Sequence, residues 1–195
     1  MPRSQEANQE IRAIRESQIR EAAATQFAHK GYVGTRIEDI TEATGISKGL
    51  IYHYFGSKEA LFTVLIERAA KGTLGLYEAA GARSGTAVER LRWLIENIIE
   101  GLAEQPDMFM VVMHALVSEA VPDEAHACAR TLAQGAMQVL THIIFEGQEV
   151  GDIKDGPAEQ LALLVNSCIQ GLAVGRIMEA PVSSVADVLI SLIAK

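Results

Sequence analysis

The chain has few of the residues that mark disulfide-rich, zinc-binding or membrane proteins. Its 195 residues include 2 cysteines and 5 prolines, and aromatic residues make up 5%. Cys128 and Cys168 lie too far apart for a disulfide scaffold and lack the paired spacing of a zinc site, so we expect packed thiols in a reduced, cytoplasmic setting. The sequence has no run of about 18 apolar residues and no apolar core near its N-terminus, so we expect neither a membrane span nor a signal peptide.

Recognisable catalytic arrangements are missing as well. The 5 histidines show no zinc-type pairing and no Glu-x-x-His motif, which removes the ligand set of a di-iron helical bundle. The sequence contains neither a Gly-rich phosphate loop nor a nucleophile elbow. We therefore expect a protein that is not an enzyme and that uses no cofactor and no metal.

The abundant residues favour an all-α fold. Apolar residues make up 49% of the chain and charged residues 22%, and long stretches repeat apolar residues at helical spacing. Glycines at positions 72, 75, 81 and 85 indicate a looser connection after the fourth helix. The predicted helices span about residues 10–30, 36–44 and 48–54, one from Lys58, and then 86–104, 106–119, 123–149, 157–179 and 182–194.

Short-range signals place the ends of the first helices. Gly31 is expected to stop the first helix, and Thr35 and Glu38 are expected to form a capping box at the start of the second. Ser47 is expected to cap the third helix, and Gly56 separates it from the fourth.

The two parts of the chain differ in charge. Residues 1–60 hold 8 Lys or Arg and 8 Asp or Glu, whereas residues 61–195 hold 9 and 17. The formal net charge of −8 therefore belongs to the second part. The first part can present a local basic face to a polyanion, since screening limits such contacts to roughly 8 Å.

Residues 36–54 match the helix-turn-helix pattern, with Gly45, Ile46 and Ser47 as the turn. We expect the inward-facing residues to be Ile37, Ile40, Ala43, Ile46, Ile51 and Phe55. The outer side of the second helix of this motif, residues 48–54, then carries Lys48, Gly49, Leu50, Tyr52 and His53, with Tyr54 at its margin. Such a helix can enter the major groove, where Gly49 allows close approach and Leu50 can touch a thymine methyl group. A helical corner with a few solvated charges is the alternative.

At these residues the sequence also resembles a known family. The run GYVGTRIEDITEATGISKGLIYHYFGSKEALF, residues 31–62, is similar to the N-terminal signature of TetR-family transcriptional regulators. The resemblance implies a homodimer that binds palindromic operator DNA and a helical C-terminal domain that senses a small molecule. It implies that the recognition helix starts at Lys48 and that Tyr52 and Lys58 contact phosphates, while Leu50 stands where the family often has threonine. The candidate DNA-binding residues are Thr35, Arg36, Ser47, Lys48, Gly49, Leu50, Tyr52, His53, Tyr54 and Lys58.

The later helices hold candidates for a ligand pocket and for a dimer interface. Methionine and aromatic side chains can line an adaptable apolar cavity, although they are more often core residues. The pocket candidates are Trp93, Phe109, Met110, Met113, His114, Met137, His142 and Asn166. Two glycines on one helical face next to an apolar stripe indicate a helical seam, with packing inside one chain as the alternative. The dimer candidates are Gln170, Gly171, Val174, Gly175, Met178, Val185 and Leu189.

The sequence as a whole predicts two functional parts. Residues 1–56 form a three-helix DNA-binding head, of which residues 1 to about 10 are a flexible extension, and residues 57–195 form a helical ligand-binding and dimerisation domain. We expect a repressor that is released from DNA by a small apolar or amphipathic ligand. The alternatives are an activator or architectural factor without such an inducer, and a helical-bundle interaction protein.

Overall fold

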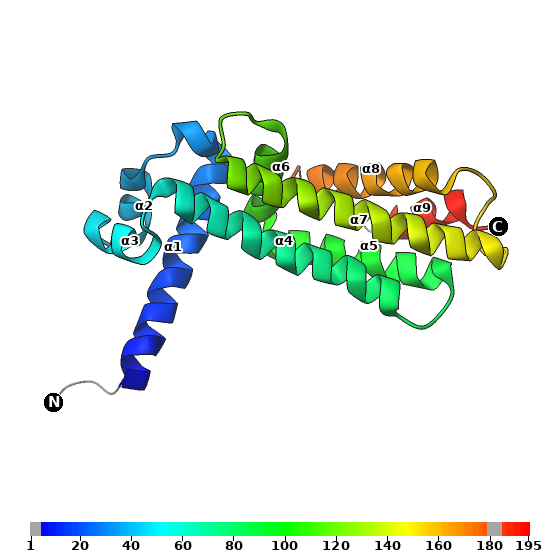
Figure 1. Cartoon of the computed structure of the whole chain (residues 1–195), viewed down its shortest axis with the longest axis horizontal. Coiled ribbons are helices and arrows are strands. Elements are labelled where there is room, and N and C mark those ends of the chain that lie inside the picture. Colours follow the sequence, from blue (N-terminus) through cyan, green and yellow to red (C-terminus); the bar gives the residue numbers. More distant parts are fainter. Residues whose placement is uncertain (1–4, 179–184) are drawn as a thin grey trace. The chain divides into compact units, whose positions relative to one another are not determined.

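The computed structural model describes residues 5–178 and 185–195, apart from the side chains of Gln5, Glu6, Arg176 and Val185. Within these ranges the chain is helical without strands, which confirms the all-α prediction (Figure 1). None of the helices in the described ranges combines the length and the apolar character that crossing a bilayer requires. The helices are α1 (Gln5–Gly34), α2 (Ile37–Thr44), α3 (Lys48–Phe55), α4 (Lys58–Ala82), α5 (Ala87–Glu104), α6 (Pro106–Val117), α7 (Asp123–Glu149), α8 (Ala158–Ile177) and α9 (Val185–Ile193).

The chain forms two compact units. The first unit comprises Met1–Ala69 and Met110–Ala129, and the second comprises Ala70–Phe109 and Arg130–Lys195. The helices α4, α6 and α7 therefore contribute residues to both units.

The first unit is built around the helices α1 to α3 and the start of α4. Phe27 of α1 and Phe62 of α4 are fully buried and meet edge to face, with ring centroids 5.0 Å apart. Tyr32 packs against both rings. At Gly31 the backbone leaves the helical conformation with a φ of 69°, a value that glycine adopts without strain, so the predicted helix stop is a kink inside α1.

Two helices are longer than their sequence signals indicate. Residues 5–10 are helical and not a flexible extension, since α1 begins at Gln5. Further along the same exposed helix, Arg12 pairs with Glu16, four residues away. The loose connection predicted at Gly72 and Gly75 is wrong, since α4 continues through both. A glycine inside a helix costs about 1 kcal/mol, and the burial of Tyr77 further along α4 outweighs that cost.

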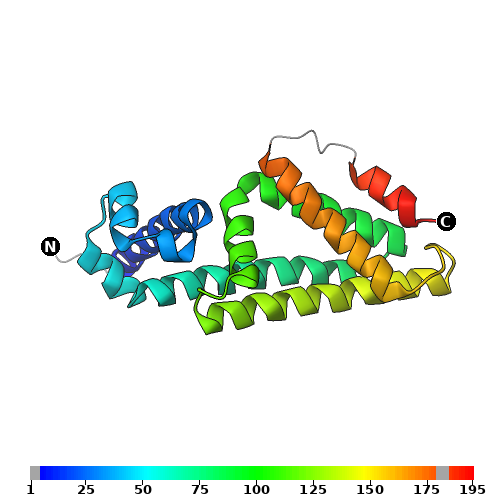
Figure 2. The same cartoon turned by 90° about the horizontal axis from the view of Figure 1, so that it is seen from above.

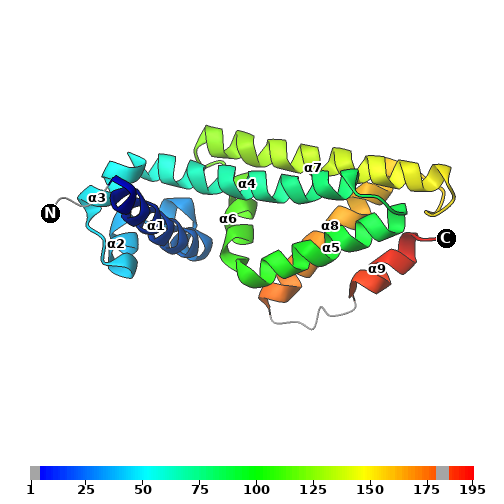
Figure 3. The same ribbon diagram turned by 90° about the horizontal axis from the view of Figure 1, so that it is seen from below.

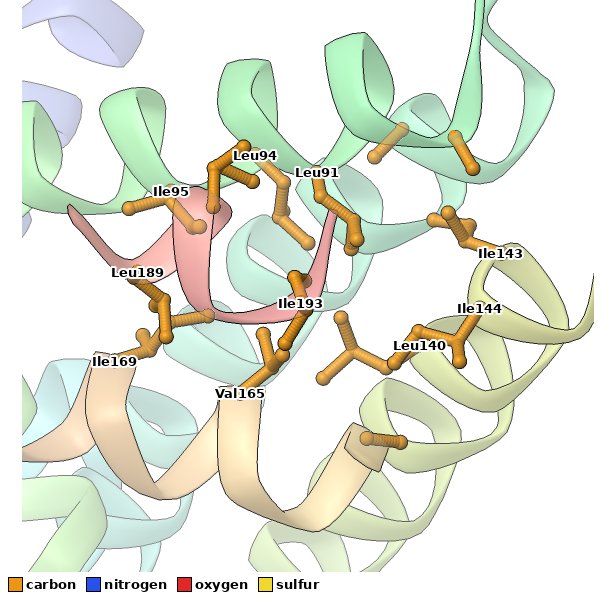
Figure 4. Packing of buried hydrophobic residues seen from close by; sticks show 14 of the residues in the cluster. Leu91, Leu94, Ile95, Leu140, Ile143, Ile144, Val165, Ile169, Leu189 and Ile193 are labelled. Atoms are coloured by element: carbon orange, nitrogen blue, oxygen red, sulfur yellow. The ribbon is translucent and has the colours of Figure 1, made fainter. Parts of the chain in front are cut away.

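The second unit packs α5 against α8 and α9, and α8 also contacts α9 (Figures 2 and 3). Figure 4 shows how the inward side chains of four helices meet in one apolar cluster. They include Leu91, Leu94 and Ile95 of α5, Leu140, Ile143 and Ile144 of α7, Val165 and Ile169 of α8, and Leu189 and Ile193 of α9.

Close contacts hold the end of α7 in place. A Cβ atom at Gly147 would lie 2.6 Å from the Cβ of Ala87 and 2.8 Å from the side chain of Ile153, so only a glycine fits. Nearby, the buried Arg90 donates to the carbonyl oxygens of Ala80 and Gly81 and to the Glu146 carboxylate. This arginine thereby joins the end of α4 to α5 and α7.

Candidate nucleic-acid interface

The helix-turn-helix geometry forms as the sequence predicts. Gly45 adopts a left-handed φ of 67°, and its N–H donates to the carbonyl oxygen of Thr41, which ends α2. Ile46 is buried in the turn, and the Ser47 hydroxyl accepts from the N–H of Leu50, as expected of an N-cap residue. Because Ile51 is buried, the opposite side of α3 faces solvent.

The exposed side of α3 carries the residues predicted to face DNA. Lys48, Gly49, Tyr52 and His53 are exposed, while Leu50 and Tyr54 are half-buried. Of the predicted inward residues, Ile37, Ile40, Ile46 and Ile51 are buried, Phe55 is half-buried and Ala43 is exposed. The phase of α3 is therefore as predicted, and α3 can present Lys48, Tyr52 and His53 together to a groove.

Lys48 has an acidic partner that the sequence pattern did not predict. Its Nζ atom lies 2.5 Å from a carboxylate oxygen of Glu38 at the start of α2. The hydrogen bond from Lys48 holds the pKa of Glu38 below its usual value, and the same bond raises the pKa of Lys48. Lys48 also lies 6.0 Å from the centroid of the Tyr52 ring. The cation at the start of α3 is therefore paired before any ligand arrives.

A recess of about 480 Å³ lies beside this pair. The first turns of both α2 and α4 contribute to it, and the N-terminal end of a helix favours anions such as phosphate, while Glu38 and Glu59 add two carboxylates to the lining. Its lining consists of Val33, Thr35, Arg36, Ile37, Glu38, Tyr52, Ser57, Lys58 and Glu59. Four of the candidate DNA-binding residues, Thr35, Arg36, Tyr52 and Lys58, thus line one concave surface.

Lys58 is engaged inside the first unit. Its ammonium group donates to the carbonyl oxygens of Tyr32 (3.0 Å) and Thr35 (3.1 Å) and lies 4.3 Å from the centroid of the Tyr32 ring. The Tyr32 hydroxyl donates to Glu59, the next residue of α4. Lys58 therefore ties the start of α4 to the corner between α1 and α2, with one N–H left for another acceptor.

The roles predicted for Thr35 are wrong. Its side chain is fully buried and its hydroxyl donates to the carbonyl oxygens of Gln26 and Gly31, so it cannot touch DNA or cap α2. Arg36 occupies the N-cap position, and the Asp39 carboxylate accepts from its N–H. The corner at Gly31 turns Thr35 inward, which shifts the start of α2 by one residue.

The start of α1 adds a cation at the edge of α3. The Arg12 guanidinium lies 5.6 Å from the centroid of the Tyr54 ring and pairs with Glu16. No local signal predicts the contact with Tyr54, because it joins two residues that are far apart along the chain. The sequence likewise indicates Glu38 only as part of a helix cap, whereas the angle between α2 and α3 places it opposite Lys48.

The ligand-pocket candidates fall into two groups. Met110, Met113 and His114 belong to the first unit, and Phe109, Trp93, Met137, His142 and Asn166 belong to the second. In the second, Trp93 and Met137 pack against the core cluster, and Asn166 accepts a hydrogen bond from the buried Tyr77 hydroxyl. His142 is wrong as a lining residue, because its side chain is 67% exposed on the outer face of α7. His114 Nδ1 is buried and has no hydrogen-bond partner in the described part of the chain.

The dimer candidates on α8 mostly lie at the surface. Val174 is 47% exposed and Met178 75%, and a Cβ at Gly171 would meet no atom within 4 Å. Gln170 and Gly175 are half-buried, and the side chain of Val185 lies outside the described residues. Leu189 is wrong as an interface residue, since it is 2% exposed within the core cluster. On α9 the exposed apolar side chains are Val188 and Leu192.

Comparisons with known proteins agree with this geometry. The family model described as bacterial regulatory proteins, tetR family, matches residues 19–65. The chain is 27% identical over 145 residues to the fatty acid metabolism regulator protein of Bacillus subtilis, covering 74% of each protein. It is 35% identical over 92 residues to the HTH-type transcriptional repressor AcnR of Corynebacterium efficiens, covering 47% of this chain and 42% of AcnR.

Solved structures share the fold. The TetR-family regulator PfmR from Thermus thermophilus superposes with a TM-score of 0.71 at 26% identity, covering 80% of this chain and 84% of PfmR. The regulator FadR from Bacillus subtilis in complex with stearoyl-CoA gives a TM-score of 0.72 at 22% identity, covering 90% and 96%. At that lower identity the likeness to FadR establishes the fold alone.

Proposed function

Because the chain belongs to the TetR family of DNA-binding transcriptional regulators, we propose that it is a repressor. It binds a palindromic operator as a homodimer and leaves the operator when a small apolar or amphipathic molecule binds. The observation that carries this proposal is the exposed face of α3, whose Lys48, Tyr52 and His53 stand beside a recess between two helix N-termini. Relatives named as repressors favour repression over activation.

Selection of bound duplexes from a random library tests the DNA part of the proposal. We expect enrichment of an inverted repeat whose half-sites lie about one helical turn apart, with affinity that falls steeply as salt rises. A reporter gene placed behind the enriched sequence then separates the modes of regulation. Loss of expression supports repression, and a gain in expression supports the activator alternative. A library without any enriched sequence contradicts specific operator binding.

The exposed apolar side chains of α8 and α9 support a dimer through these helices. Gly171 is exposed on α8 and Gly101 is exposed on α5, and neither would place a Cβ within 4 Å of another atom. If a second copy crosses α8 closely, Gly171→Leu drives the two copies apart, whereas Gly101→Leu leaves the dimer intact. Sedimentation measures the mass of both variants. A dimeric Gly171→Leu variant would place the interface elsewhere.

The ligand class rests on chemistry and on the names of relatives. In the second unit, Trp93, Phe109 and Met137 can adapt to an apolar chain. One relative is a fatty acid metabolism regulator, and a structure with the same fold holds stearoyl-CoA. We propose a long-chain acyl compound as the first ligand to test. Stearoyl-CoA should release the protein from the selected operator and free CoA should not; equal release by both would contradict an acyl ligand.

A further inference from the structure

We propose that Glu38 is a specificity-determining residue of the DNA-binding surface, because it neutralises the Lys48 ammonium and holds it at the exposed start of α3. The inference rests on the proposed DNA-binding function. In this proposal an acidic residue improves the recognition of DNA, although DNA is itself negatively charged.

The Glu38–Lys48 ion pair joins the two helices of the helix-turn-helix motif. Glu38 is the second residue of α2 and Lys48 is the first residue of α3, so the pair spans the two helices of the motif. Their atoms lie 2.5 Å apart, and the two side chains are 55% and 54% exposed. Both therefore remain accessible to DNA in the free protein.

The charges in the pair determine what Lys48 can do. Lys48 carries three N–H donors, and Glu38 uses one of them, which leaves two for acceptors on base edges. A lysine already neutralised by a carboxylate contributes less to binding through phosphates, because fewer counterions are released when it meets one. The pair thus favours directed contacts and weakens contacts that depend on charge alone.

The ion pair between Glu38 and Lys48 therefore affects the affinity for random DNA and the affinity for an operator in opposite directions. On random duplex, where phosphate contacts dominate, the pair keeps Lys48 from acting as one more phosphate contact. On an operator, the pair fixes the side chain so that less rotamer freedom is lost when it meets a base. Removing the carboxylate therefore raises affinity for random duplex and lowers the preference for the operator.

The matched variants are Glu38→Gln and Glu42→Gln. Glu42 is exposed one helical turn further along α2, and the described residues give it no ion pair, so the second variant changes the net charge equally. Fluorescence anisotropy on a random duplex and on the selected operator, at several salt concentrations, supplies the readout. We expect Glu38→Gln to bind random duplex about three- to fivefold more tightly, within the range that an exposed ion pair allows. Its salt slope on that duplex should steepen by about 0.9.

The same measurements in a Lys48→Met background complete the test. If Glu38 acts through Lys48, Glu38→Gln has no further effect once Lys48 is replaced. An unchanged operator preference in Glu38→Gln, an equal change in Glu42→Gln, or an effect that persists without Lys48 would each overturn the inference. Failure of the parent protein to bind any duplex in a salt-dependent manner would instead refute the proposed function.

Discussion

Replacing Lys58 with methionine tests whether this residue supports the first unit or serves DNA alone. The substitution keeps the length and apolar stem of the side chain but removes the ammonium group and its bonds to Tyr32 and Thr35. Hydrogen bonds from a charged donor contribute about 1.5–3 kcal/mol each, and an exposed cation over an aromatic ring contributes about 0.5–1 kcal/mol. Because Lys58 is half-buried, water replaces part of these contacts. We expect a net loss of about 2 kcal/mol in the stability of the α1–α2 corner.

Hydrogen exchange measures this loss at a defined place. The Thr35 amide donates to the Gly31 carbonyl at the corner, so its exchange reports local opening. A loss of about 2 kcal/mol corresponds to roughly 30-fold faster exchange, since each 1.4 kcal/mol is a factor of ten. Lys71→Met is the control, because Lys71 is exposed on the same helix. If the Thr35 amide hydrogen of Lys58→Met exchanges at the parent rate, the structural role of Lys58 is refuted. Lys58 would then act only as a phosphate contact, and its loss would appear only as a shallower salt dependence of DNA binding.

Two further predictions concern the second unit. Burial raises the pKa of Tyr77 from 10.0 to about 12. Tyr77 therefore loses its proton more readily in the unfolded chain than in the folded one, and its contribution to the free energy of unfolding, complete below pH 10, is lost as the pH rises from 10 to 12. By urea denaturation, the parent should lose about 1 kcal/mol more than Tyr77→Phe between about pH 8 and 11; parallel losses would contradict this. On α9, Leu189→Ala should cost about 2–5 kcal/mol, whereas Leu192→Ala, at a site 57% exposed, should cost less than about 0.5 kcal/mol. Equal costs in urea denaturation would mean that α9 presents a different face to the core.

Local signals in the sequence predicted most of the DNA-binding motif. Gly45 and Ser47 act on their immediate neighbours, so their turn and cap could be predicted without knowledge of the rest of the chain. The prediction for Thr35 was wrong because Thr35 and Arg36 compete for the start of α2, and a bend at Gly31 decides the outcome. The sequence indicates a break at Gly31 but not the direction in which the chain turns there.

Contacts between residues far apart in the sequence determine the features that local sequence signals did not predict. The phase of α9 is ambiguous in a strongly apolar segment, and contact with α5 and α8 turns Leu189 inward and Leu192 outward. Similarly, α4 passes through Gly72 and Gly75 because residues further along it are buried in the second unit. The pairing of Glu38 with Lys48 depends on the angle between two helices, which neither helix encodes alone.

The crowding around Gly147 limits how this protein can vary over evolution. Any side chain at that position would collide with Ala87 and Ile153, so the start of α5 and the turn after α7 can change only in step with it. Gly101 and Gly171 face open space and carry no such internal restriction. Proteins that descend from this chain should therefore keep glycine at position 147, because the fold requires it. If they also keep glycine at position 171, where the fold does not require it, contact with a second molecule would be the reason.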